Sequence, residues 1–324
     1  MTDSLTADAE STPAPASSHG SGSSVGAPVV FALLVVYVVW GSTYLAIRYV
    51  VATMPPYLSA ATRFTVAGLV LYPWAIRRGG AEQRRTDKPT RRHWLSALII
   101  GGVLLAFGNG SVGVAERSVP SGTAALLIGM VPLWMALFGR VQYKERLTPV
   151  AVIGLLVGFG GVALLVGGGS GHLKASGVAL LVVATLAWAV GSLYARRAPM
   201  PARPLVGTAM EMLAGGAVCV VMGAATGEFS RIHLDKFRTS SWIGLAYLIV
   251  FGSLFAYSAY TWLLRSAPTP LVSTYAYVNP AVAVFLGWLI AGEQLTARTV
   301  LAAAVIVVGV ALIVSGPWVH RRRA

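Results

Sequence analysis

The chain has 324 residues, of which 56% are hydrophobic and only 11% are charged, and its mean hydropathy is +0.71. This composition excludes a soluble globular protein of that length and is typical of an integral membrane protein that contacts a lipid bilayer. The net charge of +14 does not predict a nucleic-acid partner, because the basic residues lie in short segments between apolar stretches.

The N-terminal segment 1–27 is rich in Ser, Thr, Ala, Gly and Pro and contains no Lys or Arg. It lacks the positive start of a signal peptide and is predicted to be a disordered tail. Ten apolar stretches follow, each close to the roughly 20 residues that a helix needs to cross a bilayer. They are continuous rather than alternating, which predicts membrane-spanning helices. The predicted spans are 28–50, 57–76, 94–115, 119–140, 149–167, 175–195, 205–226, 241–264, 268–291 and 297–316, and a basic tail, 317–324, follows them.

The chain repeats itself at an offset of 148 residues. Arg117-Ser118-x-Pro120 matches Arg265-Ser266-x-Pro268, and Glu145-x-Leu147-Thr148 matches Glu293-x-Leu295-Thr296. Internal repeats of this kind occur in many secondary transporters. The predicted fold class is therefore an all-α integral membrane protein, whose ten transmembrane helices form two five-helix repeats, 28–167 and 168–316.

Five spans in each repeat make the second copy cross the membrane in the opposite direction, so the repeats are predicted to have inverted topology. If the N-terminus is cytoplasmic, 17 of the 25 basic residues lie in cytoplasmic segments, 7 lie outside, and Arg63 lies within a span. Because Lys and Arg favour the cytoplasmic side, we expect a multi-pass protein of the cytoplasmic membrane with both termini in the cytoplasm.

The polar and aromatic residues inside the spans predict a substrate site between the two halves. Trp and Tyr offer flat apolar surfaces with one polar tip, which suits an amphipathic small molecule. The alternative is that they only pack or anchor the helices at the membrane surface. For Tyr44 and Tyr194 the anchoring role is an equal alternative, whereas Trp40 and Trp188 lie well inside their spans. The candidate substrate-binding residues are Trp40, Tyr44, Asn109, Trp188, Tyr194, Tyr257, Tyr260, Tyr275 and Asn279, and Ser253 lies nearby in the eighth span.

Two prolines at equivalent positions, Pro132 and Pro280, lie within the fourth and ninth spans. Proline removes a backbone hydrogen bond and kinks a helix. We expect breaks or gating positions here, with a purely structural kink as the alternative.

Few ionisable residues lie inside the predicted spans. Arg63 and Glu211 are equivalent in the two repeats, but inversion places them at different depths, so no salt bridge is expected between them. Arg63 is expected to extend towards the nearer membrane surface. Glu211, and after it Glu116 at the outer end of the third span, are candidates for coupling transport to protons. Glu145 and Glu293 lie at helix ends and are assigned to structure.

All five histidines and all four aspartates lie outside the predicted spans, and Cys219 is the only cysteine. The sequence therefore predicts no catalytic residues, no metal site and no cofactor. It also has no nucleotide-binding motif for an ATP-driven pump.

The sequence resembles the drug/metabolite transporter superfamily, and specifically its ten-helix branch of paired EamA domains. The resemblance rests on Trp40-Gly41-Ser42-x-Tyr44, Arg63, Pro120 with Pro132, the pair Glu145 and Glu293, and the Gly-rich fifth and tenth spans. It implies a carrier of amino acids, metabolites or toxic small molecules, often an exporter, with a central cavity lined by both halves.

The sequence thus predicts a secondary transporter that exports small organic solutes by alternating access. Import or exchange of metabolites is the alternative within transport. A membrane enzyme would need clustered catalytic groups at one depth, and a scaffold would usually carry a soluble domain. A homodimer stays open as an alternative to a monomer.

Overall fold

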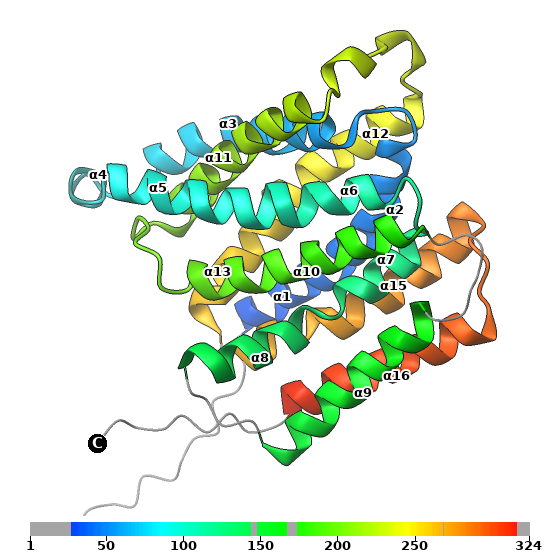
Figure 1. The fold of residues 1–324 in the computed structure, drawn as a ribbon. Helices are drawn as coiled ribbons and strands as arrows, with labels where there is room; N and C mark the ends of the chain where they lie inside the picture. Colours follow the sequence, from blue (N-terminus) through cyan, green and yellow to red (C-terminus); the bar gives the residue numbers. More distant parts are fainter. Residues whose placement is uncertain (1–26, 144–147, 167–173, 268, 316–324) are drawn as a thin grey trace, which may run out of the picture.

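The computed structural model of the chain describes residues 27–143, 148–166, 174–267 and 269–315. Every regular element in these ranges is a helix, and the helices lie alongside one another in a single bundle (Figure 1). The two predicted tails and Glu145 lie outside the described residues, apart from residue 27 of the N-terminal tail.

The first half of the chain forms long rods that are interrupted by π-helical turns. The first rod joins α1 to α2 through the π-helical segment Val36–Trp40, and another joins α5 to α6 through the π-helical segment Gly101–Gly110. Proline at the first helical position suits the start of α3, because the first N–H groups of a helix need no intrahelical partner. The helices are α1 (Ala27–Val35), α2 (Gly41–Val51), α3 (Pro56–Arg77), α4 (Ala81–Thr86), α5 (Arg91–Ile100), α6 (Ser111–Ala115), α7 (Ser121–Ile128), α8 (Val131–Tyr143) and α9 (Pro149–Val166).

The second half repeats this pattern. Its π-helical segment, Leu248–Tyr257, joins α12 to α13 and matches the segment Gly101–Gly110 of the first half to within one residue. π-Helical turns are rare and occur often at functional sites. The helices are α10 (Ala175–Ala195), α11 (Pro204–Ala225), α12 (Thr239–Tyr247), α13 (Ser258–Ser266), α14 (Thr269–Val272), α15 (Tyr275–Ala291) and α16 (Ala297–Ser315), with short 3-10 turns at Phe229–Arg231 and Leu234–Lys236.

Six helical rods among the described residues are long and apolar enough to cross a membrane. They cover 27–51, 91–115, 121–138, 175–195, 204–225 and 239–266. Shorter apolar helices cover 149–165, 278–291 and 297–312, and α3 carries Arg63. Length and composition therefore support six of the ten predicted spans, and the other four stay predictions.

Helices α3 and α11 occupy equivalent places in the two repeats and pack along their length (Figure 1). A Cβ atom at Gly68 would lie 2.8 Å from Leu213 Cγ, and one at Gly216 would lie 3.1 Å from the Thr65 backbone nitrogen. Gly216 and Leu213 are each 148 residues after Gly68 and Thr65, so the same contact occurs twice with the roles exchanged. Residue numbers decrease along α11 as they increase along α3 at these contacts, so the two helices are antiparallel.

Helices α9 and α16 form a second pair of this kind and lie side by side in Figure 1. A Cβ atom at Gly161 would lie 2.8 Å from Ile306 Cγ1, and one at Gly309 would lie 2.6 Å from Gly158 Cα. These positions are again related by 148 residues. Glycine lets the two backbones approach this closely, as in other packed membrane helices.

Acidic side chains from one half cap helix N-termini of the other half. Asp87 accepts hydrogen bonds from the backbone N–H groups of Ala202 (2.8 Å) and Arg203 (2.9 Å), just before α11 begins. Glu228 accepts hydrogen bonds from the backbone N–H groups of Tyr57 (3.2 Å) and Leu58 (3.0 Å) at the start of α3. A negative charge is favourable at the positive end of a helix, so these loops fasten the two repeats together.

The Asp87 carboxylate also forms an ion pair with the Arg203 side chain, at 3.1 Å from Nε. Partial burial alone would raise the pKa of Asp87. The hydrogen bonds from the backbone N–H groups of Arg203 and Ala202 and from the Arg203 guanidinium outweigh the effect of burial, so the pKa of Asp87 lies below its usual value.

The two predicted proline breaks differ. In the first repeat the helix is interrupted at Gly129–Met130, and Pro132 lies in the first turn of α8. In the second repeat the interruption falls earlier, at Ser273–Thr274, and Pro280 lies inside the continuous helix α15. A break therefore adjoins Pro132, whereas Pro280 is several residues away from one.

Candidate functional site

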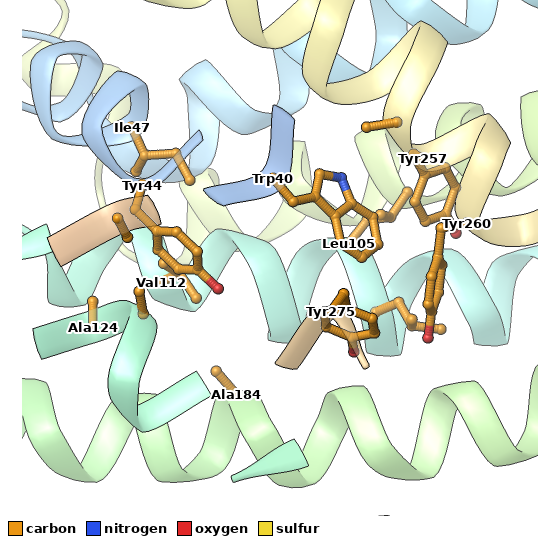
Figure 2. Packing of buried hydrophobic residues seen from close by; sticks show 14 of the residues in the cluster. Trp40, Tyr44, Ile47, Leu105, Val112, Ala124, Ala184, Tyr257, Tyr260 and Tyr275 are labelled. Atoms are coloured by element: carbon orange, nitrogen blue, oxygen red, sulfur yellow. The ribbon is translucent and has the colours of Figure 1, made fainter. Parts of the chain in front are cut away.

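Four aromatic rings from both halves meet at the centre of the bundle. The Trp40 ring lies 5.5 Å from Trp188, 4.7 Å from Tyr260 and 5.5 Å from Tyr275, measured between ring centroids. Tyr260 also contacts Trp188 and Tyr275, at 5.9 and 5.7 Å. Figure 2 shows Trp40, Tyr260 and Tyr275 close to one another, with Tyr44 on the other side of Trp40. Edge-to-face and tilted ring contacts of this kind stabilise the fold by more than the burial of their apolar surface alone.

Hydrogen bonds hold two of these rings, Trp40 and Tyr260, in place. The Trp40 indole N–H donates to the Gly252 carbonyl oxygen over 3.4 Å, and the hydroxyls of Tyr260 and Ser192 share a hydrogen bond of 2.9 Å. Gly252 lies in the π-helical segment Leu248–Tyr257, so the irregular turn presents its carbonyl to Trp40.

A small cavity lies beside the aromatic cluster. Its volume is about 40 Å³, far below the roughly 300 Å³ of a typical ligand pocket. In this structure the cavity is therefore too small to hold a typical organic ligand. Six of the predicted substrate-binding residues line this cavity: Trp40, Tyr44, Asn109, Trp188, Tyr275 and Asn279. The other lining residues are Thr43, Ile47, Gly108, Val112, Ile128 and Ala184.

The Asn279 amide sits between two segments. In the orientation that satisfies its hydrogen bonds, its nitrogen donates to the carbonyl oxygens of Tyr37 (3.1 Å) and Tyr275 (3.3 Å). The Tyr37 hydroxyl also bonds the Thr274 hydroxyl. Both contacts fasten the interrupted start of α15 to the first rod, next to the cavity.

The remaining three predicted residues lie elsewhere. Tyr260 belongs to the aromatic cluster but does not line the cavity. Tyr257 donates a hydrogen bond of 2.8 Å to Glu211 Oε2, and both side chains are buried. Tyr194 is half-buried near the end of α10 and does not line the cavity.

Arg63 does not extend to the membrane surface, and the expectation from the sequence was wrong on this point. Its side chain is buried, with 3% of the residue exposed. Nε donates to Ser253 Oγ over 2.8 Å, and Nη1 donates to Asn109 Oδ1 over 3.1 Å. The hydroxyl and the amide come from the two π-helical segments and hold the guanidinium inside the bundle, which removes the need to reach water. Arg63 also lines a second cavity of about 20 Å³.

One end of the bundle is closed by a network around Glu293. Its carboxylate accepts from the Arg48 guanidinium (2.5 Å) and from the backbone N–H groups of Ser121 (2.8 Å) and Gly122 (3.1 Å). Glu293 thus contacts an arginine, as expected from the sequence, and its partners are Arg48 of α2 and the N-terminus of α7.

Glu116 lies near Arg48 and Glu293 but behaves differently. It is 5% exposed, and neither carboxylate oxygen has a hydrogen-bond partner among the described residues. A buried carboxyl without a partner is costly, and such groups inside membranes are often functional.

The sequence missed several of these contacts. The cavity-lining residues Thr43, Ile47 and Val112 are ordinary apolar or small polar residues, which carry no sequence signal. The arginine–glutamate pair joins residues 245 positions apart. No group of three or more His, Cys, Asp or Glu side chains that could hold a metal ion occurs in the described part of the chain.

Comparison with known proteins extends these observations. The model of the EamA-like transporter family matches the chain twice, over residues 27–167 and 175–315. The chain is 37% identical over 292 residues to the uncharacterized inner membrane transporter YedA of Escherichia coli (strain K12), which covers 90% of this chain and 92% of that protein. It is 26% identical over 286 residues to the uncharacterized transporter YvbV of Bacillus subtilis (strain 168), which covers 87% and 90% of the two chains.

The fold is also similar to a solved crystal structure, with a TM-score of 0.61 and 22% identity over 88% of this chain and 95% of that one. A helical membrane bundle of two matching halves, with an aromatic cavity where they meet, defines a multi-helix membrane transporter. The chain belongs to the EamA-like transporter family, which confirms the resemblance predicted from its sequence.

Proposed function

We propose that this protein is a secondary transporter that exports small organic solutes across the cytoplasmic membrane by alternating access. The observation that carries the proposal is the central cavity between the halves, which is small in this structure and lined by Trp40 and Trp188 at equivalent positions of the two repeats. A carrier needs such a site near mid-bilayer, open to one side at a time.

The antiparallel packing of equivalent helices supports inverted topology. Both the α3–α11 pair and the α9–α16 pair repeat their glycine contacts with the roles exchanged at an offset of 148 residues. Two copies related in this way can exchange conformations, so that the site opens first to one side and then to the other. With both termini in the cytoplasm, the network around Glu293 closes the outer side.

Glu211 is our candidate for proton coupling, and Glu116 is the next. Glu211 is buried on α11, where its carboxylate accepts a hydrogen bond from Tyr257. Tyr257 is three residues from Tyr260, so this carboxyl lies one helical turn from the aromatic cluster. Glu116 lies beside the outer network, where its protonation could be linked to outer opening.

Import or exchange of metabolites uses the same cavity and remains the second candidate. A membrane enzyme is disfavoured because the cavity is lined mainly by apolar and aromatic side chains, with Asn109 and Asn279 as its amide groups. The amides can orient a solute. The other polar groups of the lining are the hydroxyls of Thr43, Tyr44 and Tyr275, and the lining holds no His, Cys, Asp or Glu that would activate them.

The test is reconstitution of the purified protein into liposomes with a panel of labelled amino acids, sugars and cationic dyes. Each solute is measured with and without an imposed pH gradient, and with unlabelled solute on the opposite side. We expect protein-dependent flux of at least one class, reduced by Trp188→Ala. A folded, reconstituted protein that moves no member of the panel in any of these modes would contradict the proposal.

A further inference from the structure

Arg63 is the one feature of the central region that the proposed transport cycle leaves unused. It is a buried guanidinium whose contacts are all with neutral groups: the Ser253 hydroxyl, the Asn109 amide oxygen and the Phe64 ring, which lies 4.8 Å from Cζ. Within the described ranges the ion pairs are Arg48–Glu293 and Arg203–Asp87, and neither includes Arg63. A buried charge without a counter-ion is costly in a membrane, and such residues usually serve a ligand.

Glu211, on the helix that packs against α3, lies too far away to neutralise Arg63. The contacts of Gly68 with Leu213 and of Gly216 with Thr65 fix the register of α3 against α11. That register places Arg63 opposite Val218, seven residues from Glu211, which is about 10 Å along the helix axis at 1.5 Å per residue. Glu211 already accepts a hydrogen bond from Tyr257.

Other buried acids are engaged or lie elsewhere. Glu228 accepts the backbone N–H groups of Tyr57 and Leu58 at the start of α3. Glu116 lies beside Arg48 and Glu293, where α7 begins. The positive charge of Arg63 is therefore left for a group that the chain itself does not supply.

The guanidinium also lies next to the aromatic cavity. Asn109 and Ile47 line both the cavity of Arg63 and the cavity of Trp40 and Trp188. The Gly252 carbonyl oxygen accepts the hydrogen bond from the Trp40 indole N–H, and a Cβ atom at Gly252 would lie 2.9 Å from Arg63 Nη2. Glycine at this position lets the guanidinium lie directly behind the aromatic site.

These positions define two neighbouring compartments of different chemistry. One is apolar and aromatic, and the other carries a guanidinium whose five N–H donors exceed the two acceptors that contact it. Guanidinium groups match carboxylates with paired hydrogen bonds. A single charge is balanced by a monoanion, whereas a phosphate dianion would leave one negative charge buried without a partner.

We infer that the solute is a small organic monoanion, with its carboxylate on Arg63 and its apolar or aromatic body against Trp40 and Trp188. The inference rests on the proposed transport function, and it names the chemical class of the solute for the same central site. Asn109 and Ser253 then position the guanidinium for the carboxylate.

The test uses three probes with the same ring and different head groups: phenylacetate, phenylacetamide and phenethylammonium. Binding to the purified full-length protein is followed by tryptophan fluorescence and confirmed by calorimetry. We expect phenylacetate to bind roughly 10- to 100-fold more tightly than phenylacetamide, the range that charge-assisted hydrogen bonds support, and phenethylammonium to bind most weakly.

Arg63→Gln removes the charge and keeps hydrogen-bonding capacity. In this variant we expect phenylacetate to lose its preference over phenylacetamide, so that the two probes bind with similar affinity. The circular dichroism spectrum and the gel-filtration profile of the variant show whether it is still folded. Arg63→Lys keeps the charge but loses the paired geometry, so it should restore only part of the preference.

The inference is overturned by a preference for the ammonium probe, by equal affinity for all three probes, or by wild-type phenylacetate binding in Arg63→Gln. Failure of phenylacetate to bind at millimolar concentration also counts against it. The proposed function is judged separately, by flux. A protein that binds the anion but moves no solute refutes transport alone, and one that moves neutral solutes independently of Arg63 refutes the anion inference alone.

Discussion

The two central tryptophans show how equivalent residues acquire different roles. The Trp40 indole N–H donates to Gly252, whereas the Trp188 N–H lies towards the Tyr260 and Tyr275 hydroxyls without a hydrogen bond of normal geometry. Trp188 therefore lines the cavity while its indole N–H lies among the hydroxyls of the aromatic cluster.

Trp188→Ala should lower transport by more than tenfold while the protein still reaches the membrane. The variant loses the ring contacts with Trp40 and Tyr260, each worth about 0.5–1.5 kcal/mol beyond area burial. Trp188→Phe keeps a ring and should retain intermediate flux. Trp288 is 49% exposed, so Trp288→Ala is the matched control and should transport normally. Parallel loss of expression and flux in Trp188→Ala would support a packing role instead.

Glu211→Gln should abolish the dependence of flux on an imposed pH gradient, because glutamine cannot exchange a proton. Exchange with solute on both sides should survive, since that mode needs no net proton movement. Tyr257→Phe removes the hydrogen-bond partner of Glu211 but keeps its carboxyl. Flux through this variant should still be driven by a pH gradient, but its dependence on pH should be shifted. Concentrative uptake by the glutamine variant under a pH difference alone would rule out Glu211 as the coupling site.

At the scale of helices, glycine decides how closely the repeats approach. In α9 and α16 the backbones nearly touch at Gly309 and Gly158, whereas a Cβ atom at Gly160 would meet no described atom within 4 Å. Packing therefore requires glycine at positions 158 and 309 but leaves room for a side chain at position 160.

Gly309→Ala should lower the unfolding temperature in detergent, because the new methyl group meets the Gly158 backbone, which cannot rotate away. Overpacking of this kind costs roughly 1–3 kcal/mol. Gly160→Ala is the matched control and should be neutral or stabilising by up to about 1 kcal/mol, since alanine favours the helix. Equal melting temperatures for the two variants would contradict the close helix approach.

The loop contact of Asp87 with the start of α11 should contribute stability that depends on pH. Its pKa is lowered in the folded protein, so the contribution is present above the unfolded pKa of about 3.9 and is lost as the pH falls through the folded value. Asp87→Asn should therefore melt below wild type at pH 7, and the difference should shrink below about pH 4. Asp235→Asn, in the exposed turn Leu234–Lys236, is the control. A difference that persists at low pH would exclude this ionisation as its cause.

For the whole molecule, the sequence predicted the family, the duplication and six of the cavity-lining residues, because aromatic and amide side chains inside apolar spans are conspicuous. It did not predict the π-helical segments, since a change of hydrogen-bonding register leaves the apolar pattern unaltered. The burial of Arg63 was missed for the same reason, because its partners Asn109 and Ser253 lie on those segments. The proline breaks were only partly predicted, because the second interruption, at Ser273–Thr274, lies away from Pro280.

Orientation in the membrane is the remaining property of the whole molecule, and we expect both termini in the cytoplasm. The reason is the excess of basic residues in the segments that would then be cytoplasmic, including the loop 77–92. Reporters fused after Arg85 should be active only inside the cell, and reporters fused after Leu234 only outside, since five spans separate equivalent positions of inverted repeats. Equal sidedness at these two positions would make the repeats parallel. It would also remove the exchange of equivalent conformations on which alternating access depends.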